Sequence, residues 1–184
     1  MHPKQAIFPA ICVAALLLFF LSQSVYGFSR SSASNYLIPK QSLSLHTINP
    51  SYSQEIREWE SIIRSVSADT GLDPDLISAL IMIESAGQPD VISSSGAVGL
   101  MQVMPSDGKA ATFQCVNGPC FHDRPSTSEL MRPEYNIFFG SALLSSLIAD
   151  HGSLREGLRA YGPMDVGYAY AEKVLALYLR YQGK

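Results

Sequence analysis

The sequence predicts a mainly α-helical domain with little or no β-structure. Apolar residues recur at helical spacing in successive segments, several segments open on a helix-capping residue and close on glycine, and strand-like alternation is never sustained. The 184 residues are 47% hydrophobic and 16% charged, which is the composition of an ordinary globular protein. We expect this domain to run from about residue 51 to residue 184.

Two helices are predicted first along the domain. One begins with Ser53 as its N-cap and ends at Gly71, and its apolar face consists of Ile56, Trp59, Ile62, Ile63 and Val66. The other begins with Asp73 as its N-cap and Pro74 at its first position, and its apolar residues are Leu76, Ile77, Leu80, Ile81 and Ile83. Because these residues leave little polar face, we expect the second helix to be buried nearly all round.

Further helical segments follow. A turn leads into a short helix that Pro105 and Gly108 end, and a long segment over residues 128–152 closes at Gly152. Residues 153–162 and 165–182 form the last two segments. Together they predict one compact helical domain.

The first 27 residues have the layout of a secretory signal peptide. A short basic region with Lys4 precedes an uncharged apolar run over residues 6–21, and Val25 and Gly27 fit the positions before a cleavage site. The run is shorter than the ~20 residues that comfortably span a bilayer, which favours cleavage over a permanent anchor. We therefore expect an exported protein, in the periplasm or at the cell surface or extracellular, with a serine-rich linker or arm over residues 28–50.

Two cysteines follow the signal segment. Cys115 and Cys120 enclose a Gly-Pro turn, and because disulfides persist in exported proteins we favour a Cys115–Cys120 disulfide. The alternative is a metal site that also uses His122, which would lack a fourth ligand and would need reduced thiolates.

Composition and motifs argue against several function classes. The formal net charge is −3 and no dense Lys/Arg block appears, which argues against a nucleic-acid partner. The sequence contains no G-x-S-x-G elbow, no phosphate-binding loop and no H-E-x-x-H motif. We expect a monomer without cofactor or metal, whose membrane contact is limited to an uncleaved signal segment.

One acidic residue, Glu84, stands out by its surroundings. It closes the almost unbroken apolar run of the second helix, next to Leu80, Met82 and Ile83, and a loop rich in serine and glycine follows. Apolar surroundings disfavour a charged carboxylate, so its pKa should rise, which suits a general acid that cleaves a glycosidic bond. The alternative is a helix-end glutamate that points into water.

A glycosidase usually needs a second carboxylate, and none stands out here. Asp90 is nearest in sequence, but beside Pro89 it is equally well explained as a turn residue. Several C-terminal tyrosines would suit a sugar-stacking wall, but at helical spacing we favour the core: Tyr161, Tyr168, Tyr170, Tyr178 and Tyr181.

Three blocks of the sequence follow a known pattern. The longest is "LISALIMIESAGQPDVISSSGAVGLMQVMP", and "RPEYNIFFGSALLSSL" and "AYGPMDVGYAYAEKVL" come after it. In this order they resemble the blocks of the soluble lytic transglycosylase catalytic domain, a branch of the lysozyme superfamily related to goose-type lysozyme. The similarity runs from about Ile56 to Tyr178. It implies a lysozyme-like helical fold and cleavage of peptidoglycan glycan strands.

The resemblance implies a mechanism with a single acid. Glu84 would protonate the glycosidic oxygen between N-acetylmuramic acid and N-acetylglucosamine, and then deprotonate the sugar's own C6 hydroxyl, which attacks C1 to give a 1,6-anhydro product. Ser93 and Gln102 fall where the family contacts the N-acetylmuramic acid near the cleaved bond. Four further residues fall on substrate-binding positions that line or support the cleft: Met104, Asn136, Tyr161 and Tyr170.

The sequence departs from the family pattern in three places. The segment Tyr161-Gly162-Pro163 is shortened and lacks an asparagine of the family, Arg132 stands where the family has an acid, and "CVNGPC" is additional. Two alternative functions stay open. One is a muramidase that hydrolyses the same bond with water, and the other is a non-catalytic peptidoglycan-binding envelope protein.

Overall fold

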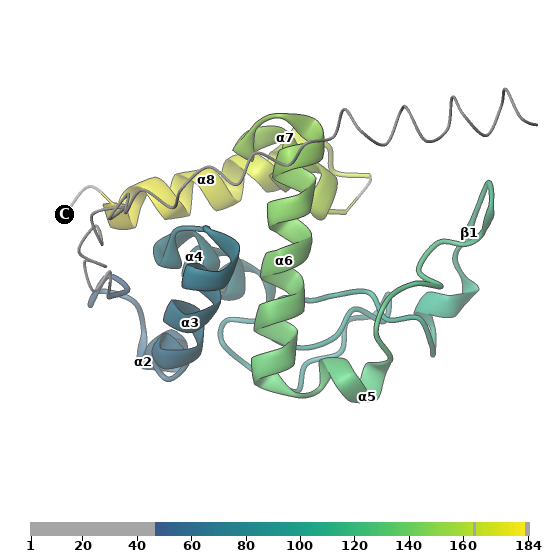
Figure 1. The fold of residues 1–184 in the computed structure, drawn as a ribbon, viewed down its shortest axis with the longest axis horizontal. Coiled ribbons are helices and arrows are strands. Elements are labelled where there is room, and N and C mark those ends of the chain that lie inside the picture. The colour runs from purple at the N-terminus through teal and green to yellow at the C-terminus, as the bar shows by residue number, and fades with distance from the viewer. Residues whose placement is uncertain (1–46, 164, 183–184) are drawn as a thin grey trace, which may run out of the picture. The chain divides into compact units, whose positions relative to one another are not determined.

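The computed structural model describes residues 47–163 and 165–182, and helices dominate this part of the chain (Figure 1). The helices are α2 (Gln54–Arg57), α3 (Glu60–Thr70), α4 (Pro74–Glu84), α5 (Thr127–Leu130), α6 (Pro133–His151), α7 (Leu154–Tyr161) and α8 (Tyr168–Gln182). A 3-10 turn, η1 (Ala110–Thr112), precedes a short antiparallel hairpin of β1 (Gln114–Cys115) and β2 (Gly118–Pro119). The predicted mainly α-helical class is confirmed. The predicted signal segment lies outside the described residues.

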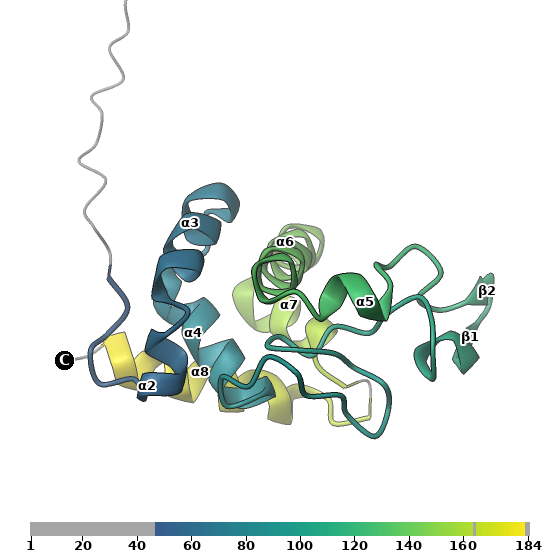
Figure 2. The same ribbon diagram turned by 90° about the horizontal axis from the view of Figure 1, so that it is seen from below.

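α6 is the central helix of the described region. α3 and α4 lie on one side of it, and α5 and the β1–β2 hairpin lie on the other, in both views (Figures 1 and 2). α7 packs against α6, and α8 packs against both α7 and α4. Gly152 ends α6 in the left-handed conformation, with a φ of 78°, as its position in the sequence predicts. Within the described residues, no helix is both long enough and apolar enough to cross a bilayer.

α4 is buried on nearly all sides, as its apolar composition predicts. The Asp73 carboxylate accepts a hydrogen bond from the Asp75 amide, so the helix begins at the predicted cap. Every residue from Leu76 to Ile81 is buried, because α3 and α8 both pack against the helix. Burial of each large aliphatic side chain stabilises the fold by about 2 kcal/mol. The helix therefore brings Glu84, its last residue, to the edge of the core.

The first predicted helix is divided into α2 and α3, which corrects the prediction of one continuous helix. The Trp59 amide donates to the Ile56 carbonyl in a tight turn, and α3 begins at the next residue. Trp59 also donates its indole N–H to the Gly87 carbonyl, at 2.9 Å. The break lets both Ile56 and Ile63 reach full burial. α3 then ends at the predicted Gly71.

The short helix predicted before Pro105 does not form. Val98 instead makes isolated β-bridges with Ile92 and Val103, and Gly99 and Gln102 have positive φ angles of 76° and 45°. A right-handed helix cannot contain such residues. The apolar residues of this segment are buried in a compact loop, so their spacing reflects the core and not a helix.

Packing begins before residue 51, where the sequence analysis placed the start of the domain. Ile48 is buried, and the Asn49 side-chain amide donates to the Tyr181 carbonyl at 2.6 Å. The ring of Tyr52 stacks on that of Tyr181 with 3.8 Å between centroids. Ile48 and Asn49 therefore belong to the packed domain, and Asn49 contacts the end of α8.

Candidate active site

Glu84 is mostly buried at the C-terminal end of α4. Its Oε1 accepts a hydrogen bond from the hydroxyl of Tyr170, in the first turn of α8. Burial raises the pKa of Glu84 to about 7, against the opposing effects of the Tyr170 hydrogen bond and the positive charge of Lys173. The carboxyl group can therefore hold or release a proton near neutral pH, as an acid that later serves as a base must do.

Two tyrosines at the ends of the α7–α8 connection surround this carboxyl group. Burial and the charge of Glu84 raise the pKa of Tyr170, and the same two causes raise the pKa of Tyr161. Both hydroxyls therefore stay protonated and act as donors. Tyr161 donates to the Met101 carbonyl at 2.8 Å, so its hydroxyl holds the loop that follows α4.

The core position favoured for the C-terminal tyrosines is confirmed for most of them. Tyr170 is buried, and three others are partly buried against the core, namely Tyr161, Tyr178 and Tyr181. Tyr168 differs, because 40% of it is exposed.

Gly162 lets the chain pass directly over the Tyr170 ring. A Cβ at this position would lie 2.3 Å from Cδ1 of Tyr170, so a larger residue would displace the ring. The shortened Tyr161-Gly162-Pro163 segment therefore packs against the residue that is hydrogen-bonded to Glu84.

The loop after α4 is attached to α6 through Asn136. The Asn136 side chain donates to the carbonyls of Val98 and Leu130, both at 2.9 Å, and accepts from the Met101 amide at 2.8 Å. Asn136 is fully buried. Asn136 therefore supports the loop, as the resemblance allows for positions that line or support the cleft, and its place among the substrate-binding residues stays a prediction.

Two glycines allow the loop to lie this close to α6. A Cβ at Gly99 would come within 2.4 Å of the Asn136 amide nitrogen, and a Cβ at Gly140 would come within 2.8 Å of Met101.

The sequence analysis missed both glycines, and it missed Lys173. The available signal for Lys173 was its position three residues after Tyr170, which puts both on one face of a helix.

Ser93 and Gln102 lie on the same loop and are partly exposed, as is Met104. The Ser93 hydroxyl oxygen accepts from the Ala97 amide at 2.9 Å. The Gln102 side-chain amide donates to the Gly99 carbonyl at 2.9 Å. Both side chains therefore stabilise the loop, and their contact with a sugar stays a prediction.

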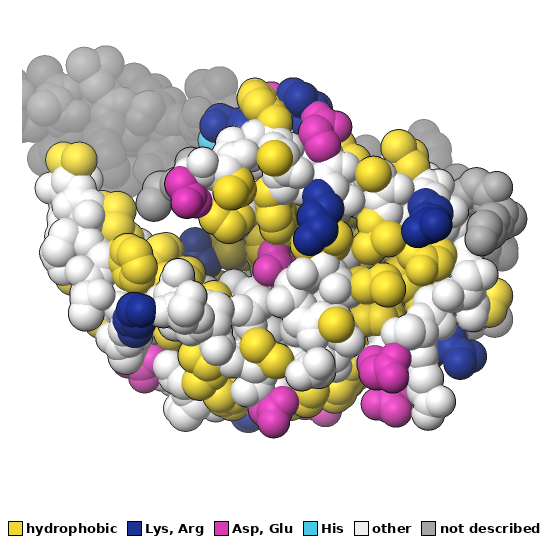
Figure 3. All heavy atoms as spheres, turned by 180° about the vertical axis from the view of Figure 1, so that it is seen from behind, with side chains coloured by type: hydrophobic (Ala, Val, Ile, Leu, Met, Phe, Trp, Pro, Cys, Tyr) yellow, Lys and Arg dark blue, Asp and Glu magenta, His cyan; other side chains and the backbone are white. Residues whose placement is uncertain are grey.

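A hollow opens on the face opposite to that of Figure 1, with hydrophobic side chains around it and an acidic side chain within it (Figure 3). Asp90 is exposed on the loop after α4. Among the described residues, the side chains that shift the pKa of Glu84 are Tyr170 and Lys173, and no second carboxylate is among them.

The predicted disulfide is present. Cys115 and Cys120 are joined with an S–S distance of 2.10 Å and close the β1–β2 hairpin, which excludes the alternative metal site with His122. In the described part of the chain, no three histidine, cysteine or acidic side chains gather as candidate metal ligands.

Comparison with known proteins assigns the family. Residues 61–170, more than half of the chain, match the family described as Transglycosylase SLT domain. The chain belongs to the SLT-domain family.

This SLT-domain chain is 42% identical over 104 residues to the endo-type membrane-bound lytic murein transglycosylase A of Klebsiella pneumoniae subsp. pneumoniae. The match covers 54% of the chain and 50% of the relative. The same enzyme of Citrobacter koseri is 41% identical over 111 residues, a match that covers 58% of this chain and 52% of the relative. The chain thus spans about half the length of these curated relatives.

Two solved structures share the fold of the SLT-domain chain. An inactive mutant of the lytic transglycosylase Slt from Pseudomonas aeruginosa gives a TM-score of 0.51 at 24% identity, over 66% of this chain and 23% of that one. The 70 kDa soluble lytic transglycosylase SLT70 from Escherichia coli gives a TM-score of 0.52 at 23% identity, over 68% of this chain and 25% of that one. The helical fold that the resemblance implied is confirmed.

Proposed function

We propose that this SLT-domain protein is a peptidoglycan lytic transglycosylase, which cleaves the β-1,4 bond between N-acetylmuramic acid and N-acetylglucosamine without water. The observation that supports this best is the largely buried carboxyl group of Glu84, with its raised pKa and its Tyr170 partner. The names of the curated relatives support the substrate class. The disulfide supports export to an oxidising compartment, the periplasm or the cell exterior.

The mechanism uses one proton that Glu84 gives and then recovers. Protonated Glu84 donates to the glycosidic oxygen as its bond to C1 breaks, and the N-acetyl oxygen of the sugar assists at C1. The Glu84 carboxylate then takes the proton of the C6 hydroxyl as that oxygen bonds to C1 and closes the 1,6-anhydro ring. Holding the C6 hydroxyl near C1 makes the attack intramolecular, so no bound water is needed.

Tyr170 has a role between these two proton transfers. Its hydroxyl donates to Oε1, which stabilises the carboxylate that exists after the first transfer and assigns both transfers to Oε2. Ser93, Gln102 and Met104 would contact the sugar, and Asn136 and Tyr161 would hold the loop that carries them.

The central prediction concerns Glu84→Gln. The amide keeps the shape of the protonated acid but cannot transfer its proton, so release of 1,6-anhydro products from purified peptidoglycan should fall at least about 1,000-fold. Mass spectrometry of the soluble products measures this, and circular dichroism checks the fold. Asp90→Asn, at an exposed loop acid, is the matched control and should retain activity.

Product mass separates the alternatives. Wild-type products that carry one added water would identify a muramidase, and the absence of any soluble product would indicate a binding protein. Normal release by Glu84→Gln would show that another group is the acid.

A further inference from the structure

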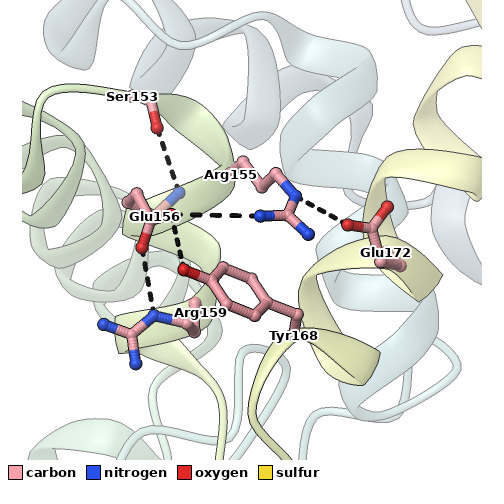
Figure 4. A network of polar contacts seen from close by, with 6 residues as sticks. All are labelled: Ser153, Arg155, Glu156, Arg159, Tyr168 and Glu172. Atoms are coloured by element: carbon pink, nitrogen blue, oxygen red, sulfur yellow. Dashed lines mark hydrogen bonds and ion pairs between the residues drawn. The ribbon is translucent and has the colours of Figure 1, made fainter.

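A cluster of charged and aromatic side chains joins α7 to the first turn of α8 (Figure 4). Tyr168, the first residue of α8, donates its hydroxyl hydrogen to Oε1 of Glu156 at 2.8 Å. The guanidinium carbon of Arg155 lies 3.9 Å from the centroid of the Tyr168 ring, and that of Arg159 lies 5.3 Å from it. Together with Glu172, we call these residues the α7–α8 clamp.

Ion pairs stabilise the clamp, both between α7 and α8 and within α7. Arg155 Nε donates to Glu172 Oε1 on α8 at 2.7 Å, and Arg159 Nε donates to Glu156 Oε2 at 3.1 Å. The hydrogen bond from Tyr168, and then that from Arg159, lower the pKa of Glu156, which is thus a carboxylate at neutral pH. An exposed ion pair contributes little alone, but here three residues of α7 hold one tyrosine ring.

Tyr168 and Tyr170 extend from opposite sides of the same helical turn. Successive residues of a helix are about 100° apart, so positions two apart face nearly opposite directions. Tyr168 is 40% exposed and contacts α7, whereas Tyr170 is 9% exposed and is hydrogen-bonded to Glu84. A shift of this turn relative to α7 would therefore move both rings together.

We propose that Tyr168 is a positioning residue for the reaction: by holding the first turn of α8 against α7, it sets the position of the Tyr170 hydroxyl on Glu84. The hydroxyl of Tyr168 is bonded to Glu156, so Tyr168 acts through Tyr170 and not on the substrate. This inference rests on the proposed lytic transglycosylase function.

The test measures kcat and KM against pH for the wild type and Tyr168→Ala, on soluble peptidoglycan glycan strands, with product masses recorded. Tyr168→Ala should lower kcat about three- to ten-fold, because the proton transfer stays possible but is less well aligned. This loss is smaller than the whole rate factor that general acid–base catalysis contributes. KM should not change. The alkaline limb of the kcat profile, where Glu84 loses its proton, should move to higher pH, since the hydrogen bond that stabilises the carboxylate is weakened.

Two further variants separate positioning from general destabilisation. Tyr170→Phe should move the same limb further, and adding Tyr168→Ala to it should cause no additional movement, because the two residues act in series. Arg132→Ala removes a similar surface pair, over the Tyr135 ring at 4.9 Å, and should leave the limb in place. Thermal unfolding of each variant accompanies the kinetics.

An unchanged alkaline limb in Tyr168→Ala, a change in KM alone, or additive shifts in the double variant would overturn the role of Tyr168, even if the wild type releases anhydro products. Absence of anhydro products from the wild type would instead contradict the proposed function. Should Tyr168→Ala not fold, Tyr168→Phe removes only the hydrogen bond to Glu156 and carries the same prediction at smaller size.

Discussion

Burial of the Glu84 carboxyl group destabilises the folded chain when the group is charged, and the same burial gives it the raised pKa that the proposed chemistry needs. The apolar surroundings that raise its pKa do so by disfavouring the charged form. Tyr170 offsets part of this penalty with a hydrogen bond to the carboxylate. The balance leaves a carboxyl group that can change its protonation state at neutral pH, and the same balance makes the stability of the protein depend on pH.

This dependence gives a prediction for Glu84→Gln. Between the ordinary pKa of 4.5 and the folded pKa of about 7, the folded chain keeps a proton that the unfolded chain has released. The contribution of this retained proton to the free energy of unfolding is therefore fully present below about pH 4.5. It falls as the pH rises through the folded pKa of about 7, and it is then lost. Glu84→Gln, which never becomes charged, should exceed the wild type in free energy of unfolding by up to about 3 kcal/mol at pH 8 and by little at pH 4.

Urea unfolding at the two pH values measures this difference. The exposed Glu134 provides the control, because Glu134→Gln should change stability equally little at both pH values. A Glu84→Gln difference of the same size at pH 4 and pH 8 would contradict the burial of the charge.

Among the elements of the fold, the loop after α4 depends on the side-chain amide of Asn136 in α6. Asn136 satisfies three buried backbone groups of the loop and of the residue that ends α5, and Gly99 provides the space for it. The loop contains no regular secondary structure beyond isolated bridges, so a side chain provides the hydrogen bonds that a helix would have made internally.

Asn136→Ala should therefore be strongly destabilising. It leaves the Met101 amide and the Leu130 carbonyl without their Asn136 partner, whereas the Val98 carbonyl keeps the Val103 amide. A buried group without a partner costs about 1–3 kcal/mol, so we expect a loss of about 3 kcal/mol in the free energy of unfolding. Chemical denaturation measures it. Asn117→Ala, in the exposed hairpin, is the control, and a similar small effect of both variants would show that the loop does not depend on Asn136.

Over the whole described domain, the segment before α2 and the end of α8 are held together. Tyr52 is buried, stacks on Tyr181 and donates its hydroxyl to the Asp75 carbonyl at 2.9 Å. These contacts join the segment before α2 to the start of α4 and the end of α8. The end of α8 is thereby fixed at Tyr181, while the clamp fixes its first turn.

Tyr52→Ala should lower the free energy of unfolding by about 3–5 kcal/mol, the usual cost of removing a buried aromatic ring. Thermal and urea unfolding test this, and Val116→Ala, at a fully exposed hairpin position, is the matched control. Equal stability of the two variants would mean that α8 is held without its contact to the N-terminal segment.

Much of this fold could be read from local patterns. Asp73 and Gly152 mark helix ends through contacts within a few residues, and the apolar run of α4 requires burial whatever surrounds it. The raised pKa of Glu84 follows from that same run. Cys115 and Cys120 are close enough in sequence to pair with each other.

Local patterns in the sequence therefore predict most of the helices, the side chains that must be buried, and the acid that lies among them. The tertiary structure alone decided the break at Trp59, the non-helical loop after α4, the buried role of Asn136 and the meeting of Tyr170 with Glu84 across 86 positions. The physical reason is that a helix end or an apolar run is satisfied by its neighbours in sequence. A buried amide or carboxyl group is satisfied by whichever distant residue the packing brings to it.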